Sequence, residues 1–418
     1  MELWSWIQSN LDQYLQLHSI PASEDLSPEK KKLLSQWSLE LKSFNEDNAL
    51  PGLTRIRCMV VDEAEAGLTV GFYLKDGRLH TTKYGYPVPS DARFLDSILL
   101  KRSLLVCTRV IGEPDLALKS EIYFVPHETL HFPLGSIIDA YGVWRDDEFF
   151  MVANALESQT SPSTRDALLQ GLSNLLGEKA ARWVLHVLLS KISERNYLTG
   201  KLVLNVTNSR NSSDLVSFLS AVTRTVYVPL TLDLLNSRSL SPKKNYDTER
   251  IEGNLFQLPN HTLLIIDENT LEAGLLNERG LRNVQDIQRL ITAQAINYDY
   301  TYYIHSLDVD YRVIILSEGK SMFKCDAAVS AEDARSPAVD IESARNFLKG
   351  IGPIAKIEES LQEVAQKYFC SRRASGEYSP EQFSRLLSLA TYEATSKQKG
   401  SVELEDWEVA LRMEQGLS

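Results

Sequence analysis

The sequence predicts an α/β fold joined to an all-β domain, with helices near both ends of the chain. Three observations carry this prediction: short strand patterns dominate between residues 51 and 150, strands alternate with helices after residue 200, and capped helical patterns flank both regions. With 418 residues, of which 43% are hydrophobic and 24% charged, the chain can form two or three folded domains. We expect a helical segment at 1–50, a barrel at 51–150, a parallel α/β domain at 162–340 and a helical lid at 341–418.

The first segment has the pattern of helices that dock on a neighbouring domain. Ser27 is a good capping residue, and Pro28 suits the first helical position. Apolar residues follow at helical spacing, and Trp4, Trp6 and Trp37 are large enough to anchor the segment. We therefore expect the first 45 or so residues to be mostly helical.

The region from residue 53 changes to a strand period. Its strand patterns are rich in β-branched and aromatic residues and are separated by Gly, Pro and Asp. They lie at 55–61, 68–74, 80–86, 103–110, 121–125 and 136–144. Such spacing favours a small antiparallel barrel of the OB type, although a β-sandwich fits the pattern equally well. The aromatic residues alternate as core residues do, without interleaved Lys and Arg, so we expect a structural or protein-binding barrel.

The third region alternates strands and helices. A polar stretch at 156–162 is the expected linker, and two helices follow it, the second of them nearly all apolar. Strands are expected at 202–206, 225–232, 262–267 and 311–316, and helices at 214–223 and 284–292. This order predicts a parallel sheet that is covered on both faces. A hairpin is expected at 295–305, and capped helices with Ser379 and Trp407 form the lid.

One strand of this region ends like the Walker-B strand of an ATPase. Four apolar residues at 263–266 lead into Asp267 and Glu268, which in such enzymes hold Mg²⁺ and polarise water. A Walker-B strand needs an upstream glycine-rich phosphate loop, yet residues 201–252 contain no glycine. Arg210 could touch a phosphate, but one flexible side chain does not replace a nest of N–H groups. We expect Asp267 and Glu268 to be degenerate Walker-B positions, with no cofactor or metal; an active ATPase using Arg210 and Glu268 is the alternative.

Two further motifs suggest other chemistry. His127, Glu128 and His131 match the zinc-peptidase pattern H-E-x-x-H, and Glu148 could be a third ligand. Prolines on both sides of this motif oppose the helix it needs, so a zinc peptidase is a minor alternative. The run Gly319-Lys320-Ser321 resembles the end of a phosphate loop, but position 314 is Ile rather than Gly, and the run follows the Walker-B strand instead of preceding it.

Bulk properties restrict location and partners. The four cysteines are scattered singly, which suits a reducing compartment and provides no zinc ribbon. The start of the chain lacks a secretory pattern, and no apolar stretch is long enough for a membrane span, so an intracellular protein is expected. A net charge of −12 opposes nonspecific binding to nucleic acid, so a role on DNA would run through a protein partner.

The α/β domain resembles the core of the minichromosome maintenance (MCM) replicative helicases. The resemblance rests on the run Glu252-Gly253-Asn254-Leu255 before the Walker-B strand, the hairpin at 295–303, and the lid-like helix around Trp407. It implies a degenerate domain of the AAA+ type. Two departures accompany the missing phosphate loop: Asn269 stands where the helicases have Phe, and Ser317 stands near the position of a sensor Asn.

The order of the motifs is similar to that of the MCM-complex-binding protein family, most strongly between residues 53 and 321. The runs that carry this resemblance are Arg57-Cys58-Met59 with Asp62, Gly200-Lys201, Gln257-Leu258-Pro259, Asn297-Tyr298-Asp299-Tyr300 and Ser317-Glu318-Gly319-Lys320-Ser321. The resemblance implies a nuclear, non-enzymatic protein that binds MCM helicase subunits in place of one ring member. It further implies a chaperone-like role in MCM assembly, protection or unloading during DNA replication, with links to the cell cycle and sister chromatid cohesion. No sequence-specific contact with nucleic acid is expected.

Overall fold

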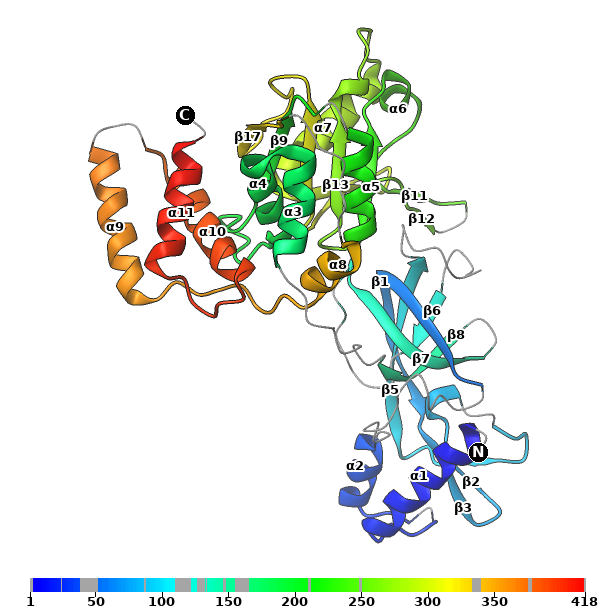
Figure 1. Cartoon of the computed structure of the whole chain (residues 1–418). Coiled ribbons are helices and arrows are strands. Elements are labelled where there is room, and N and C mark those ends of the chain that lie inside the picture. The colour runs from blue at the N-terminus through cyan, green and yellow to red at the C-terminus, as the bar shows by residue number, and fades with distance from the viewer. Residues whose placement is uncertain are drawn as a thin grey trace. The chain divides into compact units, whose positions relative to one another are not determined.

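The computed structural model divides the chain into two compact units, Met1–Ser158 and Gln159–Ser418, and each is described by itself (Figure 1). The mixed α/β class expected from the sequence is confirmed. The residues that the structure describes are 3–23, 25–37, 52–85, 88–109, 122–125, 132, 134–145, 148–154, 165–209, 212–247, 250–332, 340–374 and 378–416. The predicted linker at 156–162 lies outside them. Within the described residues, no helix has the length and apolar character needed to cross a membrane.

The first unit is built on a closed barrel of five strands. Their order around the barrel is β1-β5-β6-β8-β7, and β7 pairs with β1 to close it. β6 and β8 pair in parallel, whereas the other four pairs are antiparallel. The strands are β1 (Thr54–Val70), β5 (Leu99–Arg109), β6 (Ile122–Val125), β7 (Ile137–Arg145) and β8 (Glu148–Asn154). Inward-facing residues such as Ile56, Leu105 and Phe149 fill the barrel.

Two helices and a small sheet cover one side of this barrel. The helices are α1 (Leu3–Leu17) and α2 (Pro28–Gln36), and the sheet contains β2 (Phe72–Lys75), β3 (Arg78–Thr81) and β4 (Arg93–Phe94). The expected cap of α2 is confirmed, since Ser27 accepts a hydrogen bond from the N–H of Lys30. Trp37 is buried against Phe72 and Tyr84. The helices and the barrel therefore share one apolar core.

The second unit contains a parallel sheet of five strands in the order β10-β13-β16-β9-β17. The strands are β9 (Val203–Thr207), β10 (Thr225–Pro229), β13 (Leu263–Asp267), β16 (Arg312–Ser317) and β17 (Ala327–Ser330). Every residue of β13 is buried, because β10 and β16 flank this strand and both faces of the sheet are covered. The predicted parallel sheet is confirmed.

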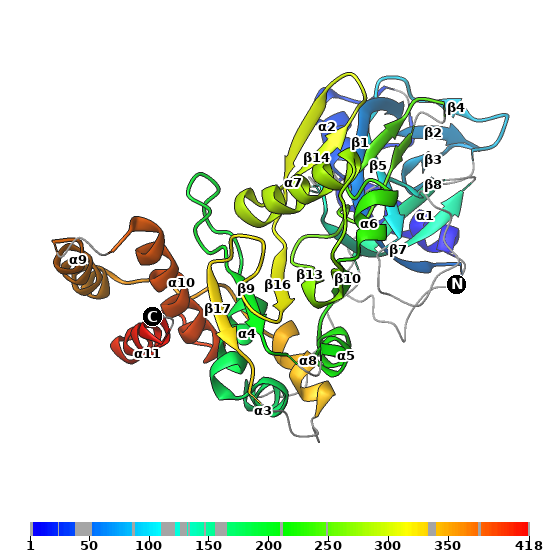
Figure 2. The ribbon, with the colours of Figure 1, turned by 90° about the horizontal axis from the view of Figure 1, so that it is seen from above.

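Alternate residues along each strand face two different cores. Leu263, Ile265 and Ile314 face one of them, which is formed with α3 (Arg165–Leu176), α4 (Glu178–Leu189), α5 (Ser212–Val222) and α8 (Ile341–Lys349). Leu264 and Ile266 face the other, which is formed with α6 (Leu232–Ser237), α7 (Glu278–Ala293) and a second sheet. Figure 2 shows these two groups on opposite sides of the row of parallel strands. The two-residue period of a strand thus places a layer on each face.

The second sheet has the order β12-β11-β14-β15 and contains the predicted hairpin. Its strands are β11 (Lys243–Asn245), β12 (Arg250–Glu252), β14 (Ala295–Asp299) and β15 (Ile304–Asp308). β14 and β15 form the hairpin, and its tip is aromatic. Tyr300 and Tyr303 stack with ring centroids 4.8 Å apart, while Tyr302 is 84% exposed.

Three helices complete the unit: α9 (Glu359–Ala374), α10 (Pro380–Ser396) and α11 (Leu404–Gln415). They form the group coloured orange to red in Figure 1. The capping box predicted at the start of α10 is confirmed, because Ser379 and Gln382 exchange side-chain and backbone hydrogen bonds. Leu386 and Leu389 pack α10 into the same core as α4, and Trp407 of α11 contacts Tyr368 of α9.

A buried charge cluster fastens α10 to α3 and α4. Glu393 is 2% exposed; one of its oxygens accepts a hydrogen bond from Arg165 at 2.8 Å, and the other lies 3.1 Å from Nε2 of His186. Burial alone would raise the pKa of Glu393, but the hydrogen bond with His186 and the charges of Arg165 and Arg182 outweigh it and hold the pKa well below its usual range. Burial lowers the pKa of His186, with Glu393 opposing this effect. His186 is therefore neutral and donates its Nε2 proton to Glu393.

This cluster predicts an acid-sensitive second unit. We expect Glu393→Gln to reduce the free energy of unfolding by about 3 kcal/mol at pH 7, because Arg165 loses its buried counter-charge. The pKa of Glu393 in the folded protein is below its unfolded-state pKa of about 4.3. The ionised carboxylate therefore stabilises the folded protein above about pH 4.3, and this stabilisation is lost as pH falls further. The buried neutral His186 also contributes stability that is lost below about pH 6.5. Urea unfolding between pH 7 and pH 3.5 should show the mutant's deficit shrinking below pH 4.3; an equal deficit in the exposed control Glu408→Gln would contradict this assignment.

Candidate functional site

The carboxyl end of β13 brings the predicted Walker-B residues to the middle of the parallel sheet. Asp267 is the last residue of the strand and is 2% exposed, and Glu268 follows it in a short 3₁₀ turn. The ends of β10 and β16 lie on either side, because Asp267 is paired with Pro229 and Leu316 in the sheet register. This edge is where ligands bind in open α/β sheets.

Both carboxylate oxygens of Asp267 are already hydrogen-bonded within the protein. One oxygen accepts a hydrogen bond from the hydroxyl of Tyr227 at 2.7 Å, and the other accepts from the N–H of Asn269 at 3.0 Å. Burial, together with the hydrogen bond to Asp267 and its charge, raises the pKa of Tyr227 to about 12. The phenol therefore stays protonated near neutral pH and remains a donor to this carboxylate.

Glu268 is bound by the loop that follows β16. Its carboxylate accepts a hydrogen bond from the hydroxyl of Ser321 at 2.6 Å and from the N–H of Met322 at 3.3 Å. Burial raises the pKa of Glu268, and these two hydrogen bonds oppose that increase. In the run Gly319-Lys320-Ser321, which resembles the end of a phosphate loop, the hydroxyl of Ser321 thus binds a carboxylate of the same chain. The hydrogen bond fastens this loop to the end of β13.

The ends of β9 and β16, next to the connection where a phosphate loop would be expected, also carry polar side chains. Asn205 of β9 donates a hydrogen bond to the carbonyl of Gly319 at 3.1 Å. The hydroxyl of Ser317 lies 2.8 Å from the side-chain oxygen of Asn205 and 2.6 Å from the same Gly319 carbonyl. Asn208 adopts a left-handed conformation with φ 57° and binds the hydroxyl of Ser330. Polar groups at the ends of β9 and β16 therefore satisfy one another.

The remaining predicted residues are distributed as follows. Arg210 lies outside the described residues, so the structure gives no contact of Arg210 that would support the ATPase alternative. His127, Glu128 and His131 also lie outside them, while Glu148 begins β8. In the part of the chain that the structure describes, no group of three or more His, Cys, Asp or Glu side chains is arranged to hold a metal ion.

Sequence reasoning missed the partners of the two carboxylates. Tyr227 precedes Asp267 by 40 residues, and Ser321 follows Glu268 by 53 residues. The one signal for Tyr227 was the alternation of side-chain direction along β10. A strand that pairs with β13 must present some side chain near the end of β13. The arrangement holds the two carboxylates in fixed positions, and both oxygens of Asp267 have a hydrogen-bond partner.

The geometry defines a mixed α/β protein with a closed barrel in one unit and, in the other, a parallel sheet whose central carboxylate is bound by its own chain. Comparison with known proteins gives its family. A family model described as mini-chromosome maintenance replisome factor matches residues 146–417. The chain belongs to this family, which confirms the resemblance read from its motifs.

Similar proteins occur in plants and animals. The chain is 30% identical over 270 residues to the mini-chromosome maintenance complex-binding protein of Arabidopsis thaliana, covering 60% of this chain and 46% of that protein. The Drosophila melanogaster protein of the same name is 26% identical over 261 residues, covering 56% and 43%. The Homo sapiens protein is 29% identical over 205 residues, covering 47% and 32%. The matches thus span less than half the length of these curated relatives.

The bond between Tyr227 and Asp267 can be tested by removing one oxygen. We expect Tyr227→Phe to lower the free energy of unfolding by about 2 kcal/mol, because a buried carboxylate loses a donor. Urea unfolding at pH 7 measures the loss. Tyr197→Phe is the matched control, since this side chain is 77% exposed and should change stability by less than about 0.5 kcal/mol. Equal stability of the two variants would show that the bond contributes nothing.

Proposed function

We propose that this protein is a non-enzymatic binding partner of MCM helicase subunits that acts in DNA replication. The observation that carries the proposal is the family match across residues 146–417, joined to relatives whose names describe them as MCM-complex-binding proteins. The proposed roles are assembly, protection or unloading of MCM complexes in the nucleus, as a chaperone-like factor linked to the cell cycle and to sister chromatid cohesion. Mimicry of a ring subunit is the proposed mechanism.

The strand order of the second unit supports mimicry of an ATPase ring subunit. Counted along the chain within the parallel sheet, the spatial order is 2-3-4-1-5, which is the order of an AAA+ domain. Asp267 ends the third of these strands, where a Walker-B carboxylate belongs. A hairpin precedes the fourth strand, and helices α9 to α11 follow the sheet as a lid would. An AAA+-like domain of this kind would offer the surfaces by which ring subunits recognise their neighbours.

The barrel of the first unit is proposed to be of the OB type. Its strands have the order 1-2-3-5-4 when counted along the chain, with the third and fifth strands parallel. Its buried residues are apolar, including the sulfur-containing Cys58, Cys107 and Met151, as expected for a structural or protein-binding barrel. The resemblance to the MCM-complex-binding protein family, strongest between residues 53 and 321, covers both the barrel and the α/β domain.

The edge of the sheet supports a role without nucleotide hydrolysis. Hydrolysis needs a glycine-built phosphate cradle after the first strand, and a Walker-B carboxylate free to hold Mg²⁺. Residues 201–252 contain no glycine, and Asp267 is bound by Tyr227 and Asn269. Glu268, which would polarise water, is bound by Ser321. These contacts do not favour the ATPase alternative, and nothing in the described residues favours a zinc peptidase.

Co-purification tests the proposed partner. The full-length protein, carrying an affinity tag, should recover MCM subunits from nuclear extract, as identified by mass spectrometry. Purified MCM subunits should then bind the purified protein directly, which separates true contact from bridging by other proteins. Recovery of none of the MCM subunits in either experiment would overturn the proposal.

Nucleotide turnover tests the proposed absence of catalysis. The purified protein should hydrolyse ATP with Mg²⁺ no faster than the matched variant Glu268→Gln, because neither protein has a phosphate cradle. Phosphate release is the measurement, and an active AAA+ ATPase is the positive control. Turnover that disappears on Glu268→Gln would instead establish an ATPase.

A further inference from the structure

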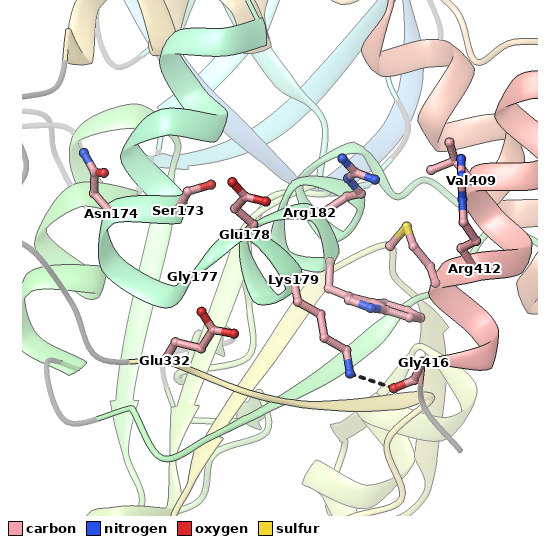
Figure 3. A pocket seen from close by; sticks show the side chains of 12 residues that line it. Ser173, Asn174, Gly177, Glu178, Lys179, Arg182, Glu332, Val409, Arg412 and Gly416 are labelled. Carbon is pink, nitrogen blue, oxygen red and sulfur yellow. Dashed lines mark hydrogen bonds between the residues drawn. The ribbon is translucent and has the colours of Figure 1, made fainter.

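A cavity of about 890 Å³ lies between the turn that joins α3 to α4 and the last turns of α11 (Figure 3). It is remote in sequence from Asp267 and Glu268, and its lining includes none of the residues that bind them. Five of its lining residues are charged: Glu178, Lys179, Arg182, Glu332 and Arg412. Their arrangement gives the cavity two ends of opposite charge.

Two arginines form the basic end. Arg182 comes from α4 and Arg412 from α11, and Figure 3 shows both guanidinium groups on the α11 side of the cavity. Within the described ranges, neither guanidinium has a hydrogen-bond or ion-pair partner. Lys179 is different, because its ammonium donates to the carbonyl of Gly416 at 2.7 Å. Two unpaired guanidinium groups from facing helices can bind one carboxylate from both sides.

The acidic end already serves the protein itself. Glu332 packs on Gly177, the residue that caps α4, so closely that a Cβ on this glycine would lie 2.7 Å from the carboxylate. Gly177 also has φ 80°, which favours glycine. The carboxylate therefore supplies the negative charge that the N-terminus of α4 favours. An anionic ligand would be repelled from this end and directed to Arg182 and Arg412.

An unsatisfied donor lies in the wall of the same cavity. Trp183 is fully buried, and its indole N–H has no hydrogen-bond partner among the residues described. A buried donor without a partner carries a penalty of about 1–3 kcal/mol, which an incoming acceptor would relieve. Val409 and Met413 form the adjacent apolar wall, and the flexible side chain of Met413 can shift to admit a ligand.

We propose that this cavity binds an acidic peptide segment of a partner protein. A Glu or Asp side chain binds between Arg182 and Arg412, a peptide carbonyl accepts from the indole of Trp183, and an aliphatic side chain contacts Val409 and Met413. The apolar wall favours a peptide over a free phosphate ion, and Glu178 and Glu332 disfavour a polyanion such as nucleic acid. The inference stands on the cavity alone and does not depend on the proposed binding of MCM subunits.

Selection from a phage library of random heptapeptides tests the site. The full-length protein should enrich sequences that combine Asp or Glu with an aliphatic residue. Arg182→Gln with Arg412→Gln should weaken binding of the enriched peptide at least tenfold. Both side chains are exposed, so urea unfolding should still show a folded protein, with at most a small loss of stability because Arg182 no longer lowers the pKa of Glu393. Arg282→Gln is the matched control, as an exposed arginine on α7. Failure to enrich acidic sequences, or equal binding by the double variant, would overturn the proposal.

The indole N–H of Trp183 gives a direct second measurement. Its resonance in a ¹H–¹⁵N spectrum, assigned by its loss in Trp183→Phe, should move downfield when the enriched peptide is added. The Gln-for-Glu or Asn-for-Asp version of the same peptide should leave this resonance in place. Binding of the peptide without a shift of Trp183 would place it elsewhere on the protein. An equal shift with inorganic phosphate would assign the cavity to small anions, and either result would overturn the peptide site.

Discussion

The second unit depends on the burial of β13 on both faces of the parallel sheet. Leu263 and Ile265 face one core while Leu264 and Ile266 face the other, so every layer of the unit is organised around this strand. The strand delivers Asp267 to a site that is almost fully enclosed. An ionised carboxylate in such a site must have hydrogen-bond donors, because an unpaired buried charge is strongly unfavourable. The contacts of Tyr227 and Asn269 meet that requirement without a metal ion or nucleotide.

The same constraint supports the proposal of a role without nucleotide hydrolysis. An ATPase leaves its Walker-B carboxylate available to a hydrated cation, whereas here a phenol and a backbone N–H bind both oxygens. Ser321 fixes Glu268 in a similar way, and Asn205 with Ser317 closes the neighbouring strand ends. At this edge of the sheet, the polar side chains thus bind one another and hold the strand ends and the following loop together. These contacts support the proposed role as a binding partner rather than as an ATPase.

The sequence predicted the parts of the fold whose signal is local. The apolar run of β13, the capping box of Ser379 and Gln382 and the aromatic hairpin could all be predicted, because each depends on neighbouring residues. β8 and β17 were not predicted: β8 begins at Glu148, only three positions after β7 ends at Arg145, and β17 is only four residues long. α7 begins at Glu278, six residues before the predicted start; its cap is Asn277, whose side chain accepts a hydrogen bond from the N–H of Gly280, and a glycine in the first turn weakens the helical pattern of the sequence there. The partners of Asp267 and Glu268 were unreadable, since they depend on strand register and on a loop about 50 residues away.

The apolar core on the α3–α4 face of the sheet joins segments that are far apart in the chain. Leu172 and Trp183 come before the sheet, whereas Leu389 and Trp407 follow it by many residues, yet all four belong to one cluster. During synthesis, α3, α4 and the sheet therefore emerge with part of this face uncovered until residues 380–415 have been made. Contacts of such large sequence separation form late, and exposed apolar surface invites aggregation in the interval. Newly made copies of this protein should consequently depend on holdase chaperones until translation has passed α11.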